Sequence, residues 1–177
     1  MKRRSALKSM GLALGGLVSL PAWATNWTPE SIGRTTTLSE NQELLLSEIV
    51  EAIIPETTTA GKVSPGAKSL KVHQFAARMI SDCYPASAQE ILQKGLANID
   101  AAANKTYSKS FTALTPKERV SVLTAMSTAS DATEKQFVNM IKNLTIQGYT
   151  NSEYYMNNVL KYNMAPGFYH GCVPVAS

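Results

Sequence analysis

The sequence predicts an all-α protein, organised as a single compact domain of five or six helices with an irregular C-terminal tail. Three observations lead to this fold class. Apolar residues recur at helical spacing through most of the chain. No stretch alternates apolar and polar residues for long enough to predict a convincing strand. Segments rich in Pro, Gly, Ser and Thr interrupt the helical pattern and divide it into separate helices.

The first predicted helix begins at Ser39, which forms a capping-box pattern with Gln42, and it ends at Pro55. Its apolar face consists of Leu45, Leu46, Ile49, Val50 and Ile53. Residues 56–66 are rich in Thr, Gly and Pro, so we expect them to form a loop. A second helix is predicted over residues 67–82, and its apolar face is formed by Leu70, Val72, Phe75, Ala76, Met79 and Ile80.

Two further capping boxes predict the starts of the next two helices. Ser87 and Glu90 predict a third helix as far as Ala103, followed by a polar segment over residues 104–110. The fourth helix begins at Thr115, with a Pro in its first turn and a Glu at the third position. Its inward-facing residues are expected to be Val120, Leu123 and Met126.

Asp131 and Glu134 predict the start of a fifth helix, whose apolar residues are Phe137, Met140, Ile141 and Leu144. We expect Gly148 to end this helix in the left-handed conformation. A short sixth helix is predicted over residues 151–160, and it carries Tyr155 and Val159. The tail, residues 162–177, contains two Pro and two Gly and is expected to be irregular.

The first 24 residues have the pattern of a secretory signal, with a basic start, an apolar middle and an A-x-A end. This segment resembles the twin-arginine export consensus at Arg3, Arg4, Leu7 and Lys8. Cleavage is expected after Ala24, with Ala22 as the other small residue of the site. The apolar run covers about 12 residues, whereas a spanning helix needs roughly 20. We therefore expect a signal rather than a retained anchor, and a signal that stays attached is the alternative.

Charge is distributed unevenly between the signal and the rest of the chain. The basic residues of the first 24 positions account for the whole formal net charge of +4, so the remainder is formally neutral. Residues 25–37 are expected to form a loose leader, and residues 38–177 the helical domain. A neutral domain without basic clusters lacks the electrostatic footprint of a nucleic-acid-binding protein, and we exclude that class.

The sequence contains no signature of a nucleotide, haem or iron–sulfur site. His73 lies among apolar neighbours in a predicted helix, with no ligand or carboxylate four residues on, so we expect a structural role. His170 and Cys172 could form a Cys–His nucleophile pair, but no third group is present to orient them. We predict no catalytic, cofactor-binding or metal-binding residue in this chain.

Cys83 and Cys172 are the two cysteines of the chain. An exported protein enters an oxidising compartment, so a disulfide is expected. We favour a bond between these two residues, because only two are present. The alternative is a bridge from one of them to a partner subunit.

Aromatic residues gather in the tail and just before it. They are Tyr149, Tyr154, Tyr155, Tyr162, Phe168 and Tyr169, with His170 beside the last. Tyr is enriched at protein interfaces because it offers a large contact area at a low entropic cost. These rings either pack the tail onto the chain's own helices or form a docking face for a partner, and the sequence leaves both possibilities open.

Four groups of residues together resemble one known family in their order and spacing. These are Leu38–Pro55, Val72–Phe75 with Met79–Tyr84, Leu144–Tyr149 with Ser152 and Glu153, and Tyr162 with Pro166, Gly167, Tyr169 and Gly171–Pro174. With the twin-arginine leader, they make the chain similar to the gluconate 2-dehydrogenase subunit 3 family over residues 38–174.

This resemblance implies a non-catalytic small subunit of a periplasmic FAD-dependent dehydrogenase that oxidises a sugar, a sugar acid or a glycoside. In such enzymes a large subunit of the glucose–methanol–choline type holds FAD and the substrate, and electrons commonly pass to a c-type cytochrome. The small subunit supplies the twin-arginine signal to the export machinery, carries its partner across the membrane and stabilises it. Membrane association is then expected only through the signal or a cytochrome partner.

The resemblance also assigns roles to residues of this chain. It implies that Cys83 and Cys172 form a structural disulfide and that the tail aromatics contact the partner. Two other functions are compatible with the sequence. One is an independent periplasmic α-helical binding protein, which would be a stable monomer with a pocket. The other is a small enzyme built on Cys172 and His170, which would require a free thiol.

Thiol titration of the exported chain, denatured without reductant, tests the disulfide. We expect no reactive thiol and an unchanged mass on non-reducing electrophoresis, because Cys83 and Cys172 pair within the chain. The Cys83→Ser variant is the control and should release one thiol, at Cys172. Two reactive thiols in the wild-type chain would contradict the pairing and return the Cys172–His170 enzyme to consideration.

Overall fold

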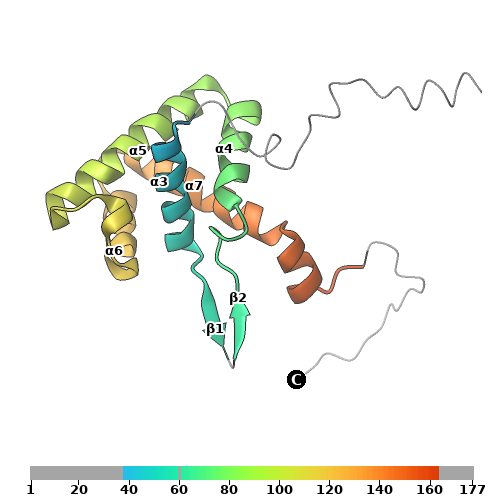
Figure 1. The fold of residues 1–177 in the computed structure, drawn as a ribbon. Helices are drawn as coiled ribbons and strands as arrows, with labels where there is room; N and C mark the ends of the chain where they lie inside the picture. Colours follow the sequence, from blue (N-terminus) through green and yellow to red (C-terminus); the bar gives the residue numbers. More distant parts are fainter. Residues whose placement is uncertain (1–37, 60, 164–177) are drawn as a thin grey trace, which may run out of the picture. The chain divides into compact units, whose positions relative to one another are not determined.

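The computed structural model describes residues 38–59 and 61–163, and the predicted all-α class is confirmed there. Within these residues five α-helices and two short helical segments follow one another, and a two-stranded hairpin comes after α3 (Figure 1). The elements are α3 (Glu40–Ile53), β1 (Thr57–Thr59), β2 (Lys62–Ser64), α4 (Val72–Cys83), α5 (Ala86–Tyr107), η2 (Phe111–Ala113), α6 (Pro116–Thr128), α7 (Ala132–Thr150) and η3 (Tyr155–Val159). The signal, the leader and the tail from residue 164 lie outside the described residues.

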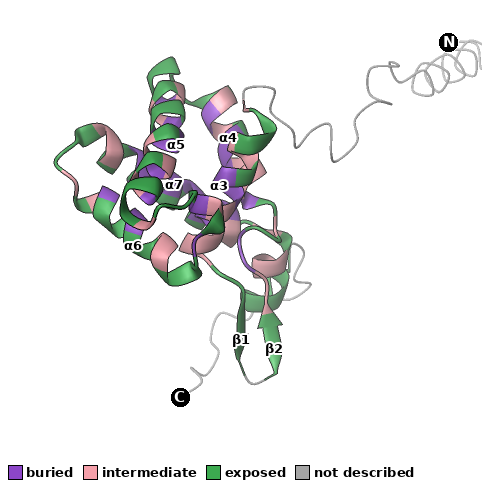
Figure 2. Cartoon of the chain, turned by 60° about the vertical axis from the view of Figure 1, so that its left-hand side comes forward, coloured by how far each residue is buried: buried purple, intermediate pink, exposed green. Residues whose placement is uncertain are grey.

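Helix α7 lies at the centre of the packing and contacts α3, α4, α5 and α6. Phe137, Ile141 and Leu144 are spaced to lie on one face of this helix, and all three are fully or almost fully buried. Leu46 and Ile49 of α3 are also fully buried. Figure 2 shows the buried residues on the facing sides of the helices and exposed residues on their outer sides. The amphipathic spacing therefore does form the core that the sequence predicts.

Two glycines allow helices to approach α7 closely. A Cβ atom added at Gly95 of α5 would lie 2.1 Å from the Phe137 ring. One added at Gly148 of α7 would lie 2.7 Å from Phe75 and 2.9 Å from Val72, both on α4. The prediction that Gly148 ends its helix is wrong, because α7 continues to Thr150 and Gly148 is buried inside it. At both positions the missing side chain makes room for an aromatic ring.

The capping predictions are confirmed at three helices and wrong at one. Ser39 and Thr115 each form a complete capping box, with Gln42 and Glu118 respectively. Asp131 caps α7 by accepting a hydrogen bond from the Thr133 amide. Helix α5 instead begins at Ala86, without a side-chain cap. Ser87 therefore already lies in the first turn, where it cannot act as the cap.

Several predicted boundaries shift in the structure. Helix α4 starts at Val72 rather than residue 67, because turns occupy residues 67–71 and Lys71 is left-handed (φ 55°). Helix α5 continues through Tyr107, where a polar segment is predicted. Val120 is predicted to face inward, but its side chain is 49% exposed, and Val122 is buried instead. The apolar residues of α6 thus occupy more than one face.

The predicted loop over residues 56–66 contains an antiparallel hairpin. Thr57 pairs with Ser64 and Thr59 with Lys62, and the turn includes Gly61 with φ 78°. Strands this short carry no alternating apolar pattern, so they give no strand signal. Both strands are almost entirely exposed (Figure 2). The predicted sixth helix also differs, because η3 is a single π-helical turn and its Val159 is exposed.

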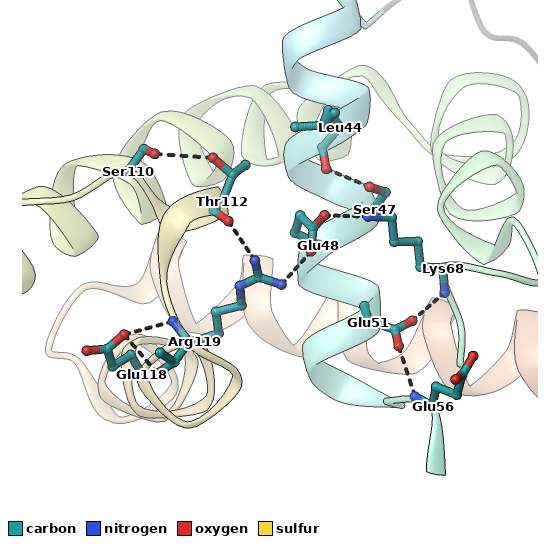
Figure 3. Close-up of polar contacts among 11 residues, drawn as sticks. Leu44, Ser47, Glu48, Glu51, Glu56, Lys68, Ser110, Thr112, Glu118 and Arg119 are labelled. Carbon is teal, nitrogen blue, oxygen red and sulfur yellow. Dashed lines mark hydrogen bonds and ion pairs between the residues drawn. The ribbon is translucent and has the colours of Figure 1, made fainter. Parts of the chain in front are cut away.

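A charged cluster of Glu48, Lys68 and Arg119 joins α3, the segment before α4, and α6 (Figure 3). The Glu48 carboxylate pairs with both cations, and its contact with the Lys68 ammonium is 2.5 Å long. Arg119 also donates a hydrogen bond of 2.6 Å to the Thr112 carbonyl, and its guanidinium lies over the Phe111 ring. The Glu48 and Arg119 side chains are each only 14% exposed. Removing either partner would leave the other charge poorly solvated.

Burial by itself raises the pKa of Glu48, but the hydrogen bond from Lys68 and the charge of Arg119 hold it below the ordinary value of 4.5. The lowered pKa contributes stability above about pH 4.5, and this stability is lost as the pH falls through the folded-state value. We expect Glu48→Gln to lower the free energy of unfolding by about 1–3 kcal/mol near pH 7. Chemical denaturation at several pH values should show this difference shrinking as the pH falls below about 4.5. A difference that does not change with pH would contradict the role of the Glu48 charge.

Candidate functional site

The tyrosines predicted to form a docking face gather where α7 ends, beside the base of the hairpin. The Tyr149 hydroxyl donates a hydrogen bond of 3.0 Å to the Pro65 carbonyl. The Tyr154 hydroxyl lies 3.3 Å from the Ser64 hydroxyl. The rings of Tyr149 and Tyr155 pack edge to face, with their centroids 6.0 Å apart. Burial raises the pKa of Tyr149, in line with a phenol that acts as a hydrogen-bond donor.

Glu51 also holds the base of the hairpin (Figure 3). Its carboxylate accepts hydrogen bonds of 2.9 Å from the amides of Glu56 and Lys68, one before and one after the hairpin. Gly66 lies directly against this carboxylate, because an added Cβ would be 2.3 Å from Oε1. The sequence gives no signal for Glu51, since its two partners are backbone amides. Glu51 and the tyrosines together fix the base of the hairpin and leave its strands exposed.

The structure separates the predicted contact residues into two groups. Tyr149, Tyr154 and Tyr155 are partly buried and contact their own chain, as in the intramolecular alternative. Tyr162 is 54% exposed, and Val159 and Leu160 beside it are also exposed. Apolar and aromatic side chains are therefore exposed to solvent at the end of η3 and just after it, together with Lys161. Contact of any of these residues with a partner stays a prediction.

His73 has a carboxylate nearby that the sequence search missed. Its Nε2 atom lies 3.9 Å from Glu43 of α3, and Gln74 donates a hydrogen bond of 3.4 Å to the same carboxylate. Burial lowers the pKa of His73, although Glu43 opposes the effect, so the imidazole is neutral near pH 7. A search along one helix could not find Glu43, because it comes from a different element. Among residues 38–59 and 61–163 there is no group of three or more His, Cys, Asp or Glu side chains that could hold a metal.

The structure describes only some of the remaining predicted site residues. Cys83 is the last residue of α4 and is exposed. Its predicted partner Cys172 lies outside the described residues, so the disulfide stays a prediction. Also outside them are the export-signal and cleavage residues and the end of the tail: Arg3, Arg4, Leu7, Lys8, Ala22, Ala24, Phe168, Tyr169 and His170. None of the helices in the described part of the chain is both long and apolar enough to cross a membrane.

Comparison with known proteins identifies a family. The family model described as gluconate 2-dehydrogenase subunit 3 matches residues 40–167, which include every described helix. No curated protein and no solved structure matches the chain. The match covers most of the chain and agrees with the resemblance seen in the sequence.

Tyr149→Phe tests whether the tyrosine hydroxyl fixes the hairpin. The substitution removes the hydrogen bond to the Pro65 carbonyl, and we expect it to destabilise the hairpin locally by about 1 kcal/mol. Amide hydrogen exchange of residues 57–64 should become faster, while exchange in α7 is unchanged. Tyr162→Phe is the control, because the Tyr162 side chain is mostly exposed. Equal exchange in both variants would contradict an anchoring role for Tyr149.

Proposed function

Because the chain belongs to the gluconate 2-dehydrogenase subunit 3 family, we propose that it is the non-catalytic small subunit of a periplasmic FAD-dependent dehydrogenase. The observation that carries this proposal is the family match over residues 40–167. The family description names a subunit, and a subunit requires at least one partner chain. The catalytic work of the complex is then assigned to that partner.

In this proposal FAD and the substrate bind to a large subunit of the glucose–methanol–choline type. The substrate is a sugar, a sugar acid or a glycoside, and electrons leave through a c-type cytochrome. No residue of the present chain acts on the substrate. Its own contribution is to bind the large subunit and stabilise it.

The second part of the proposal concerns export. The basic pair Arg3 and Arg4, with the apolar run behind it, supports a twin-arginine signal. This route carries folded proteins, so a cofactor-loaded partner can cross the membrane together with the chain that bears the signal. A large subunit without a signal of its own would then depend on this chain to reach the periplasm.

The described surface supports a role in binding another protein. Large apolar side chains are exposed at several places, including Val63 on the hairpin, Val120 on α6, Ile146 on α7 and Leu160 after η3. Single exposed apolar residues are common on any protein. Because the family is described as a subunit, this chain is expected to have a partner. Binding to that partner would bury these side chains and remove them from water.

Substitution of the basic pair tests the escort role. We expect the double variant Arg3→Lys, Arg4→Lys to block export, because lysines keep the charge but not the twin-arginine pattern. Dehydrogenase activity in the periplasmic fraction should fall by at least about tenfold, and flavin-containing large subunit should accumulate in the cytoplasm.

Lys2→Arg, which leaves the pair intact, is the matched control and should not change export. If the large subunit still reaches the periplasm in the double variant, the chain is not its escort. If no dehydrogenase depends on this chain in either compartment, the proposed subunit role itself is wrong.

A further inference from the structure

We infer that the groove between the C-terminal end of α3, α6 and α7 is the main docking site for the large subunit, and that it takes an apolar segment carrying one carboxylate. This inference rests on the proposed function, and it specifies the surface and the chemistry of the partner segment. It differs from the expectation drawn from the tail aromatics, because three of those rings are engaged within the chain.

The groove has a volume of about 470 Å³ and an apolar lining. Leu123 of α6 and Val138 of α7 are buried at its base, and Ala52 and Ile53 of α3 are partly buried. Val120 also lines it and remains 49% exposed. Three helices that pack on one another thus leave a concave surface in which apolar side chains face solvent. Such a surface suits a helix or an extended segment of a partner.

The α6 side of the groove is poor in charge. No charged residue occurs from residue 120 to residue 128 of α6, although Ser121, Thr124, Ala125 and Thr128 are exposed there. The solvent-facing side of α5, by contrast, carries Glu90, Lys94 and Lys105 among its residues. The centres of protein interfaces are depleted in charged residues relative to other protein surface. The composition of this α6 surface is therefore compatible with burial in an interface.

Among the described residues that line the groove, Lys142 alone is charged. It is exposed, and within residues 38–59 and 61–163 its ammonium group forms no ion pair. Lys68 and Arg119, in contrast, each form an ion pair with Glu48. A lone cation at an uncharged groove is complementary to a single carboxylate. This charge fixes the orientation of the partner segment and excludes segments that place a cation there.

Another concave surface of the chain has different chemistry. Leu44 of α3 is 54% exposed and lines a groove whose other members include Asn41, Gln42 and Asp100. The Asp100 carboxylate already accepts a hydrogen bond from the Phe111 amide. The described residues that line this groove include one carboxylate and no cation, so Leu44 serves as a matched control for an exposed apolar residue outside the proposed docking site.

The test uses the full-length tagged chain, expressed in its native cell and purified with whatever large subunit it holds. The measured quantity is bound flavin per tagged chain, together with dye-linked dehydrogenase activity. We expect Val120→Glu and Lys142→Glu each to lower both values by at least about tenfold. Leu44→Glu and Lys105→Glu introduce the same changes elsewhere and should lower neither. Lys142→Arg keeps the charge and should retain the complex.

Circular dichroism and the midpoint of thermal unfolding establish that each variant is folded. Val120 and Lys142 are exposed, so their substitution removes no core contact. If the wild-type chain brings down no flavoprotein, the proposed function and this inference are both overturned. If the wild-type chain brings it down and the groove variants do so equally well, only the docking site is wrong.

A photo-crosslinking residue at position 124, inside the groove, identifies the occupant directly. We expect a crosslink to a peptide of the large subunit that contains Asp or Glu, and none from the same probe at position 44. A crosslink from position 124 to a second copy of this chain, or to the chain's own tail, would overturn the assignment of the groove to the large subunit.

Discussion

Close packing around α7 is the constraint on which the rest of the structure depends. This helix contacts the four other α-helices described, and the approach is possible because Gly95 and Gly148 have no side chain. The space beside each glycine is filled by an aromatic ring, Phe137 and Phe75 respectively. Protein interiors are packed at the density of organic crystals, so even one added carbon at these positions would force the helices apart. The absence of a side chain at Gly95 and Gly148 therefore allows α5 and α4 to approach α7 closely.

This packing also positions the surface features that matter for the proposed function. Helix α7 presents Lys142 to the groove shared with α3 and α6, and near its C-terminal end it carries Tyr149, which holds the base of the hairpin. The core is thus a rigid support for two solvent-facing features, an apolar groove and an exposed hairpin. A small subunit that stabilises a larger flavoprotein needs such preformed surfaces, because little ordering entropy is then lost on binding.

Structural features that depend on residues close together in the sequence can be predicted from it. Features that depend on contacts between residues far apart in the sequence cannot. The capping box at Thr115 depends on residues three positions apart, and it is present. Ser87 has the same pattern but lies inside a helix that starts earlier. Gly148 does not end its helix but leaves room for Phe75, and such a packing role cannot be recognised from its position at a predicted helix end. Glu48 and Arg119 lie 71 positions apart, so no spacing rule could pair them. Val120 and the uncharged surface of α6 become informative only once the helices are placed.

Isolation of the native assembly tests whether this chain works as a subunit bound to a flavoprotein. Size-exclusion chromatography of the tagged chain from periplasm would be followed at the flavin absorbance and assayed for dye-linked oxidation of sugars and sugar acids. We expect the chain to elute with a yellow partner several times its own mass, and the activity to elute with them. A folded, colourless chain that elutes alone would contradict this role and would favour an independent helical binding protein.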